Sequence, residues 1–308
     1  MLKKSKIYYE VLGMNIEIMH YPKKRICQEF YDIIEFLKKY GATGYNKNWH
    51  WARWEWLLGH MGLDESTLPK IGLFRNNGKI VGLVTHDMRT AVYILCKTEY
   101  GFIKPQMVDF ARKSLSCEGI SSIYVDENDI ELISIVEAEG YSQTSNSEYV
   151  LELDCNEKHS YSLDDDFNFT DYYTTKNLTK YVEVIHKGFE NEGSPMHITE
   201  ADIPERPHYN PKLALFAVAP NGEYAAHCGM WYSPDTEICY VEPVATIPEY
   251  RKRGLGKAVV LECINRCVEM GAKKALVISN QQFYYSLGFK DYSIHRLWEK
   301  NKWSQKAE

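Results

Sequence analysis

Long apolar runs are missing from this chain of 308 residues. Uninterrupted apolar runs such as residues 91–96 are far shorter than the roughly 20 residues that a membrane-spanning helix needs. Residues 1–6 carry the positive charge that begins a signal peptide, but Tyr8, Tyr9 and Glu10 stand where its apolar core would follow. We therefore expect a cytoplasmic protein without a membrane partner.

A strong excess of either charge is also missing. The chain has 36 Lys and Arg residues against 42 Asp and Glu residues, for a net charge of −6. A general nucleic-acid binder needs a basic face that displaces counterions from phosphates. We therefore expect no nucleic-acid partner.

The eight cysteines include no CxxC pair, and no paired histidine spacing typical of a zinc site accompanies them. Cys263 and Cys267 stand four residues apart on a predicted helix, but the stretch around them offers no third ligand. We expect reduced thiols in the core and no bound metal.

The length indicates two domains of about 150 residues each. In the C-terminal half, the turn Pro220-Asn221-Gly222 predicts a β-hairpin over residues 213–232. A strand over 238–246 contains Pro243, which is typical of an edge, a bulge or a place where two strands part. An amphipathic helix from 255 to Gly271, a strand over 274–278, a short helix over 281–287 and a last strand over 292–299 follow.

The N-terminal half repeats this order. It predicts a hairpin around Gly78, a strand over 91–98, a helix over 106–116, a strand over 122–126 and a helix over 130–139. Gly78 precedes Gly222 by 144 positions, and Gly140 precedes Gly288 by 148. Two copies of one domain, residues 1–155 and 167–308, account for this repetition, and chance similarity of two α/β halves is the alternative.

A glycine-rich turn separates the Pro243 strand from the helix that follows it: Arg251-Lys252-Arg253-Gly254-Leu255-Gly256-Lys257. Glycines allow a phosphate to approach closely, and the free N–H groups at a helix start favour an anion. Ala258 follows Lys257 where a Walker A loop requires Ser or Thr. The turn therefore predicts a phosphate cradle of another kind.

Residues 242–258 resemble the acetyl-CoA signature (Q/R-x-x-G-x-G/A) of the GNAT superfamily of N-acetyltransferases. Residues 280–289, NQQFYYSLGF, are similar to the second signature of that family. The matching N-terminal segment 99–106 has a single glycine and contains Pro105. The resemblance implies an α/β (α+β) fold of two tandem GNAT-like domains. Each would be a mixed, mostly antiparallel twisted sheet flanked by helices, with an N-terminal copy that has lost its cofactor.

The resemblance also implies acetyl-CoA as co-substrate. The splayed strand would offer its backbone to the pantetheine amides, and the glycine turn would hold the pyrophosphate. Asn280 would bond the pantetheine, and a helix N-cap is its alternative role. The expected cofactor-binding residues are Val244, Ala245, Thr246, Arg251, Lys252, Arg253, Gly254, Leu255, Gly256, Lys257 and Asn280.

Two residues are expected to carry the chemistry. Tyr284 aligns with the family tyrosine that protonates the departing CoA thiolate, and core packing is its alternative role. Glu242 is the candidate base for the amine, and a solvent-facing charge on an edge strand is its alternative. His227, Trp231 and Tyr240 either line an acceptor channel or pack in the core.

The expected activity is direct transfer of an acetyl group from acetyl-CoA to a primary amine of a small molecule. The two glutamates in residues 190–197 would suit a cationic amine, although acidic loops are commonly just solvated. Two alternatives stay open: a non-catalytic acyl-CoA-binding or scaffold module, and a transferase that uses a longer acyl or an aminoacyl donor. We expect a monomer or a homodimer.

Overall fold

The computed structural model of the protein describes residues 7–11, 14–88 and 91–301. The charged start at residues 1–6 lies outside the described residues. The chain forms two compact units: residues 1–150 with 292–308, and residues 151–291.

The first unit contains a sheet in the order β1-β2-β3-β4-β5-β6-β13. The pairs are antiparallel except for β5 and β6, which run parallel and are joined by a helical crossover. Its strands are β1 (Ile7–Val11), β2 (Met14–His20), β3 (Gly72–Asn76), β4 (Lys79–Asp87), β5 (Ala91–Cys96), β6 (Ile120–Asp126) and most of β7 (Ser142–Asp154) and β13 (Lys290–Asn301). Its helices are α1 (Gln28–Tyr40), α2 (Trp51–Leu58), η1 (Glu65–Lys70), η2 (Thr98–Ile103), α3 (Lys104–Ser114) and α4 (Ile130–Ala138).

The second unit repeats this plan in the order β12-β11-β10-β9-β8, with β11 and β12 parallel and the other pairs antiparallel. Its strands are β8 (Asn168–Asp171), β9 (Ala214–Val218), β10 (Tyr224–Ser233), β11 (Ile238–Thr246), β12 (Lys274–Ile278) and the end of β7. Its helices are α5 (Tyr172–Thr175), α6 (Leu178–Gly188), η3 (Glu200–Asp202), η4 (Pro211–Leu213), η5 (Pro248–Tyr250), α7 (Leu255–Glu269) and α8 (Gln282–Ser286).

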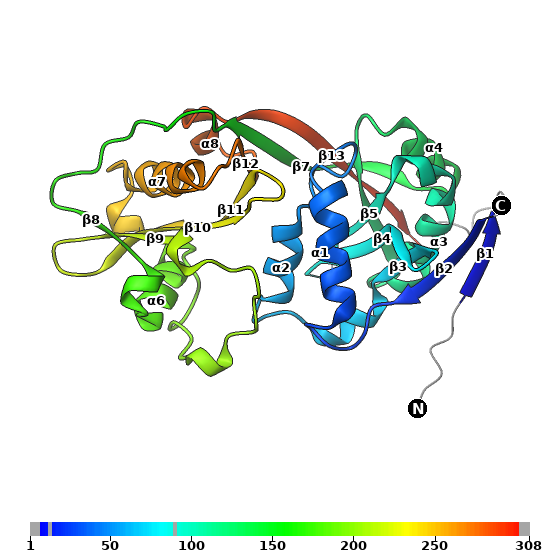
Figure 1. The fold of residues 1–308 in the computed structure, drawn as a ribbon, viewed down its shortest axis with the longest axis horizontal. Helices are drawn as coiled ribbons and strands as arrows, with labels where there is room; N and C mark the ends of the chain where they lie inside the picture. The colour runs from blue at the N-terminus through cyan, green and yellow to red at the C-terminus, as the bar shows by residue number, and fades with distance from the viewer. Residues whose placement is uncertain (1–6, 12–13, 89–90, 302–308) are drawn as a thin grey trace. The chain divides into compact units, whose positions relative to one another are not determined.

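Helices cover both faces of this second sheet (Figure 1). On one face, four of the apolar residues that predict the amphipathic helix α7 pack against buried side chains of β10 and β11: Leu255, Val259, Cys263 and Cys267. The fifth, Met270, stands at the C-cap of α7 and is exposed. On the other face, α6 packs on the same two strands, with Val184 buried beside Phe216. The predicted α/β class, the mostly antiparallel sheets and the tandem plan are therefore confirmed.

The last strand differs from the prediction. We expected residues 292–299 to close the C-terminal domain, but from Tyr292 onward β13 belongs to the first unit and pairs there with β6. His295 stands opposite Asp126, and Asn301 stands opposite Ile120. Turn signals mark where a strand begins, whereas its partner depends on which sheet edge is free in three dimensions.

Candidate active site

Strands β11 and β12 separate where Pro243 predicts it. Their parallel pairing is confined to Ile238–Tyr240 against Lys274–Leu276, and β11 then continues beside β10 alone among its sheet partners. The Glu242–Pro243 peptide is cis, and the β10 register shifts opposite it. Gly229 lies so close that a Cβ there would stand 2.5 Å from the Glu242 carbonyl oxygen. The parting strands leave one edge of β11 without a strand partner.

Successive residues of β11 direct their backbone N–H and C=O groups alternately at β10 and at this open edge. The Ile247 N–H donates to the Ala225 carbonyl at 3.0 Å, and the antiparallel register continues back through Val244. Hydrogen-bonded and non-hydrogen-bonded pairs alternate along such a ladder, so Ala245 directs its backbone at β10, while Val244 and Thr246 direct theirs at the open edge. Ala245 is therefore no longer a candidate for pairing with pantetheine, whereas Val244 and Thr246 are.

The glycine turn leads into the N-terminus of α7 at this open edge. Gly254 is the N-cap residue, with a left-handed φ of +78°, and no side chain caps the helix. The first N–H groups of α7 therefore have no intrahelical or capping acceptor. A Cβ on Gly256 would stand 3.0 Å from Thr246 Oγ1, so the helix start packs tightly against β11. Leu255 is buried and anchors the turn.

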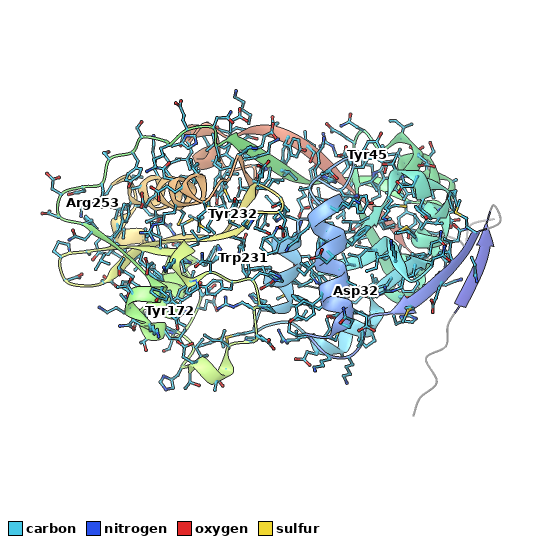
Figure 2. All side chains as sticks on the ribbon, viewed as in Figure 1. Asp32, Tyr45, Tyr172, Trp231, Tyr232 and Arg253 are labelled. Atoms are coloured by element: carbon cyan, nitrogen blue, oxygen red, sulfur yellow. The ribbon has the colours of Figure 1, made fainter. Side chains whose placement is uncertain are left out.

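The two arginines of the turn are engaged within the protein. Arg251 donates to the carbonyls of Thr246 and Gly188 and pairs with Glu190 at 2.7 Å. Figure 2 labels Arg253 near the start of α7, where it pairs with Asp164. Both guanidinium groups are thus paired with carboxylates in this structure, and their expected role of adding charge at the pyrophosphate stays a prediction.

Two lysines supply free positive charge at the turn instead. Lys252 and Lys257 are exposed, and neither has an ion-pair partner within the described residues. They flank the glycines, which places two mobile cations beside the uncapped helix start.

Asn280 lies at the exposed end of β12, one residue before the N-cap of α8. That N-cap is Gln281, so the alternative role of Asn280 as a helix cap is wrong. Its exposed amide stays a candidate contact for pantetheine.

The structure brings Tyr284 and Glu242 together. Tyr284 lies on α8 with 8% of its surface exposed, and burial, with smaller effects from Cys228 and the Glu242 carboxylate, raises its pKa well above the usual value. The phenol therefore keeps its proton over the whole physiological range. Glu242 is partly buried, and its carbonyl accepts from Trp231 Nε1 at 3.1 Å. The Tyr284 phenol thus lies near enough to the Glu242 carboxylate to feel its charge, in the region where β11 parts from β12.

His227 is completely buried on the α6 face of β10, between the rings of Phe216 and Tyr181. Burial lowers its pKa to about 3, and Nδ1 bonds the Leu215 carbonyl. A histidine that stays neutral in this way is a packing residue and not a base. Tyr240 is paired with Trp231 across the strands and is buried as well.

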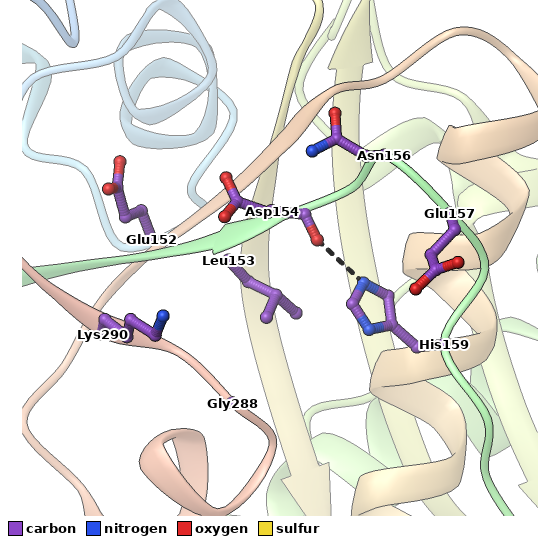
Figure 3. A pocket seen from close by; sticks show the side chains of 8 residues that line it. All are labelled: Glu152, Leu153, Asp154, Asn156, Glu157, His159, Gly288 and Lys290. Carbon is purple, nitrogen blue, oxygen red and sulfur yellow. Dashed lines mark hydrogen bonds between the residues drawn. The ribbon is translucent and has the colours of Figure 1, made fainter.

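Two hollows of the second unit lie away from these residues. One, of about 370 Å³, is bordered by the end of β7 and by Gly288 and Lys290, with His159 bonded to the Asp154 carbonyl (Figure 3). The other, of about 550 Å³, lies between the end of α6 and η5. Neither is lined by Tyr284 or Glu242. Among the described residues, no group of three or more His, Cys, Asp or Glu side chains is arranged to hold a metal ion.

The equivalent place in the first unit is filled by its own side chains. Strands β5 and β6 pair only at Val92 and Tyr93 and then part, as β11 and β12 do. At the start of the following helix α3, however, Lys104 is buried and bonds Asp129 and Glu131, each at 2.8 Å. A Cβ on Gly101 would stand 2.9 Å from the Glu131 carboxylate. Carboxylates therefore occupy the surroundings of this helix start, where a phosphate would be repelled.

Residues 151–291 thus form an α/β domain with an open strand edge beside an uncapped helix start. Residues 181–289 match the model of the Acetyltransferase (GNAT) family, so this part of the chain is a GNAT domain. The predicted family resemblance is confirmed. No curated protein matches the sequence significantly.

Solved structures of similar fold extend over nearly the whole chain. A GCN5-related N-acetyltransferase from Sphaerobacter thermophilus has a TM-score of 0.57 at 13% identity, covering 93% of this chain and 96% of its own. A tandem GNAT protein from the clavulanic acid biosynthesis pathway has a TM-score of 0.55 at 11% identity, covering 93% and 99%. A Drosophila protein has a TM-score of 0.51 at 11% identity, covering 92% and 98%. At these identities the likeness is one of fold.

Sequence reasoning missed the side chains that line the α6 face. Arg206 and Tyr209 come from the segment between α6 and β9, and Tyr172 and Tyr181 from α5 and α6. No motif marks them, because they are brought together from two helices and an irregular segment that are separate in the sequence. No helix in the described part of the chain has both the length and the apolar character needed to cross a membrane.

Proposed function

We propose that the protein is an acetyl-CoA-dependent N-acetyltransferase that moves an acetyl group to a primary amine of a small molecule. The observation that carries the proposal is the meeting of three features: the open edge of β11, the uncapped start of α7, and Tyr284 beside Glu242. The first two fit a cofactor with a peptide-like arm and a pyrophosphate. A module that only binds acyl-CoA has no need for the third.

Different residues would bind different parts of acetyl-CoA. Val244 and Thr246 would pair with the pantetheine amides, as an added strand would. The N–H groups of Leu255 and Gly256 would hold the pyrophosphate, and Lys252, Lys257 and, after exchange of their present partners, Arg251 and Arg253 would add charge. Asn280 would reach the pantetheine from the end of β12.

The thioester of acetyl-CoA supplies an activated acetyl group. Glu242 takes the proton that the amine nitrogen loses as its bond to the carbonyl carbon forms, directly or through a water. Tyr284 donates its proton to the sulfur as the carbon–sulfur bond breaks, which leaves free CoA thiol and an N-acetylated amine. Burial raises the pKa of the phenol. Burial would raise the pKa of a CoA thiol in the same direction, so the proton affinities of donor and acceptor would shift together.

We further propose that the first unit binds no acetyl-CoA, because Lys104, Asp129 and Glu131 fill the helix start where the pyrophosphate would lie. The first experiment is a calorimetric titration of acetyl-CoA into the whole chain. One molecule bound per chain is the expected result, followed by release of CoA thiol when amines are added. Two molecules per chain would contradict the proposal for the first unit, and the absence of binding would contradict the proposed function.

A further inference from the structure

Arg206 stands out among the arginines of this protein. Nine arginines lie in the described part of the chain, and eight of them form an ion pair with a carboxylate. These eight are Arg25, Arg53, Arg75, Arg112, Arg251, Arg253, Arg266 and Arg296. Arg206 alone among the described arginines has none, although it is partly buried. A partly buried guanidinium without a carboxylate keeps its paired N–H donors available for an anion from outside the chain.

Aromatic side chains surround this cation. Its guanidinium carbon lies 4.0 Å from the centre of the Tyr209 ring. Tyr181 lies within hydrogen-bonding reach of Arg206, and Tyr172 lies near enough to feel its charge. Glu200, which accepts from the Tyr172 hydroxyl, forms no ion pair with Arg206 in the described residues.

The Tyr209 hydroxyl is a second sign of a missing partner. Its oxygen is buried and makes no hydrogen bond of normal geometry within the described residues, although it lies beside the Tyr181 hydroxyl. A buried phenol that can donate therefore stands next to an arginine that lacks an anion. Both observations point to the same kind of ligand group.

The cluster formed by Arg206, Tyr172, Tyr181 and Tyr209 extends toward Glu242, the candidate base. The ring centres of Tyr209 and Trp231 are 5.7 Å apart, and Trp231 bonds the Glu242 carbonyl. Trp231 and Tyr172 are labelled in Figure 2, on β10 and α5 of the second unit. An acceptor lying along Tyr209 and Trp231 would place one end at Arg206 and the other at Glu242.

We propose that the acceptor amine carries an anionic group, a carboxylate or a phosphate, which Arg206 binds with the help of the Tyr181 and Tyr209 hydroxyls. This rests on the proposed N-acetyltransferase function and names its substrate class: an amino acid or an amine phosphate with an apolar or aromatic body. Guanidinium presents paired donors that match a carboxylate or a phosphate, and phenols add neutral donors. Glu242 would receive the amine end.

The test uses matched pairs of amines on the full-length chain, with release of CoA thiol as the signal. The carboxylate arm compares each common amino acid with its decarboxylated amine, for example tyrosine with tyramine and lysine with cadaverine. The phosphate arm compares pyridoxamine 5′-phosphate with pyridoxamine, both primary amines with an aromatic body. In at least one arm we expect kcat/KM for the anionic member to exceed that of its partner by about 10-fold or more, the range of a charge-assisted contact.

Three variants distinguish loss of anion binding from a general loss of structure: Arg206→Gln, Arg206→Lys and the control Arg112→Gln. Arg206→Gln is expected to raise KM for the anionic member by roughly 10²-fold, to change kcat little and to leave the partner amine within about two-fold. Arg206→Lys should restore part of the loss, and Arg112→Gln, whose residue lies on α3 of the first unit, should change neither.

Preference for the decarboxylated or dephosphorylated amine would overturn the proposal, and so would an equal effect of Arg206→Gln on both members of a pair. If the chain binds acetyl-CoA but acetylates none of the anionic amines, the proposed acceptor class is overturned while cofactor binding stands. A chain that binds no acetyl-CoA would refute the proposed function itself. Calorimetry with acetyl-CoA alone distinguishes these last two outcomes.

Discussion

Gly254 has a close structural match elsewhere in the chain. Its φ is +78°, that of Gly78 in the first hairpin turn is +77°, and at both positions no atom lies within 4 Å of where a Cβ would stand. Replacement by alanine therefore imposes the same backbone strain at the two sites, about 1 to 2 kcal/mol. Only at Gly254 does the open space adjoin the helix start that is proposed to hold the pyrophosphate.

Gly254→Ala is expected to weaken acetyl-CoA binding by about 10-fold or more, because the methyl group enters the phosphate's approach. Gly78→Ala should lose similar stability and keep its affinity. Calorimetric titration of both variants provides the measurement. Equal acetyl-CoA affinities of the two variants would contradict the proposal that this turn binds the pyrophosphate.

Tyr284 and its neighbour Tyr285 form a second natural pair. The Tyr285 hydroxyl bonds Asp291 at 2.7 Å and points away from the proposed chemistry, whereas Tyr284 is buried beside Glu242. Tyr284→Phe should lower kcat by roughly 10²-fold with little change in acetyl-CoA affinity, because a proton donor to sulfur is lost. Tyr285→Phe should retain most of the activity. If single-turnover rates of the two variants are the same, Tyr284 is a packing residue.

At the scale of elements, the start of α3 is stabilised by a buried ion pair. The side chains of Lys104 and Asp129 are 9% and 4% exposed, whereas that of Glu131 is 57% exposed. Burial disfavours the ammonium, but hydrogen bonds to Asp129 and Glu131 outweigh it and raise the pKa of Lys104. Asp129 also caps α4 by accepting from the Leu132 N–H at 3.1 Å.

Asp129→Asn keeps the capping oxygen and removes the charge. It should lower the free energy of unfolding by about 2 to 3 kcal/mol, since the buried Lys104 is left with only the exposed Glu131 as its counter-charge. Glu131→Gln, at an exposed site, should cost less than about 1 kcal/mol. Urea denaturation followed by circular dichroism measures both free energies of unfolding. Equal losses in the two variants would show that the exposed Glu131 contributes as much to the ion pair as the buried Asp129.

At the scale of the whole molecule, three buried histidines couple stability to pH. Burial lowers the pKa of His50 and His227 to about 3 and that of His295 to about 4, the last against an opposing effect of Asp126. In the unfolded chain all three bind protons near pH 6.5. Below that pH the unfolded chain takes up more protons than the folded one, so stability is present above about pH 6.5 and is lost as the pH falls toward 3 or 4.

The free energy of unfolding should therefore fall by about 1.4 kcal/mol per pH unit for each histidine between pH 6 and 4.5. His227→Gln should reduce the slope by the contribution of one proton, whatever its effect on stability at pH 7. His197→Gln, at an exposed position, should leave the slope unchanged. Urea titrations at a series of pH values give the slope, and an unaltered slope in His227→Gln would contradict this assignment.

Most elements of both units could be predicted from the chain alone, because periodicity and turn residues are local signals. The strand over 238–246 and the glycine stops at Gly222 and Gly271 depend only on neighbouring residues, and they appear in the structure within a residue or two. The signatures that imply the family are contiguous in the same way. The family resemblance, the fold class and the position of the glycine turn were thus determined by the sequence itself.

What only the tertiary structure decided depends on contacts between distant residues. The β6 partner of β13, the engagement of Arg251 and Arg253 by carboxylates, and the backbone orientation of Ala245 follow from packing and register. The cluster around Arg206 is likewise assembled from α5, α6, β10 and an irregular segment, and no local signal shows that these segments come together. Local chemistry determines where elements begin and end, whereas burial and the pairing of charges across the fold determine which side chains are left to meet a substrate.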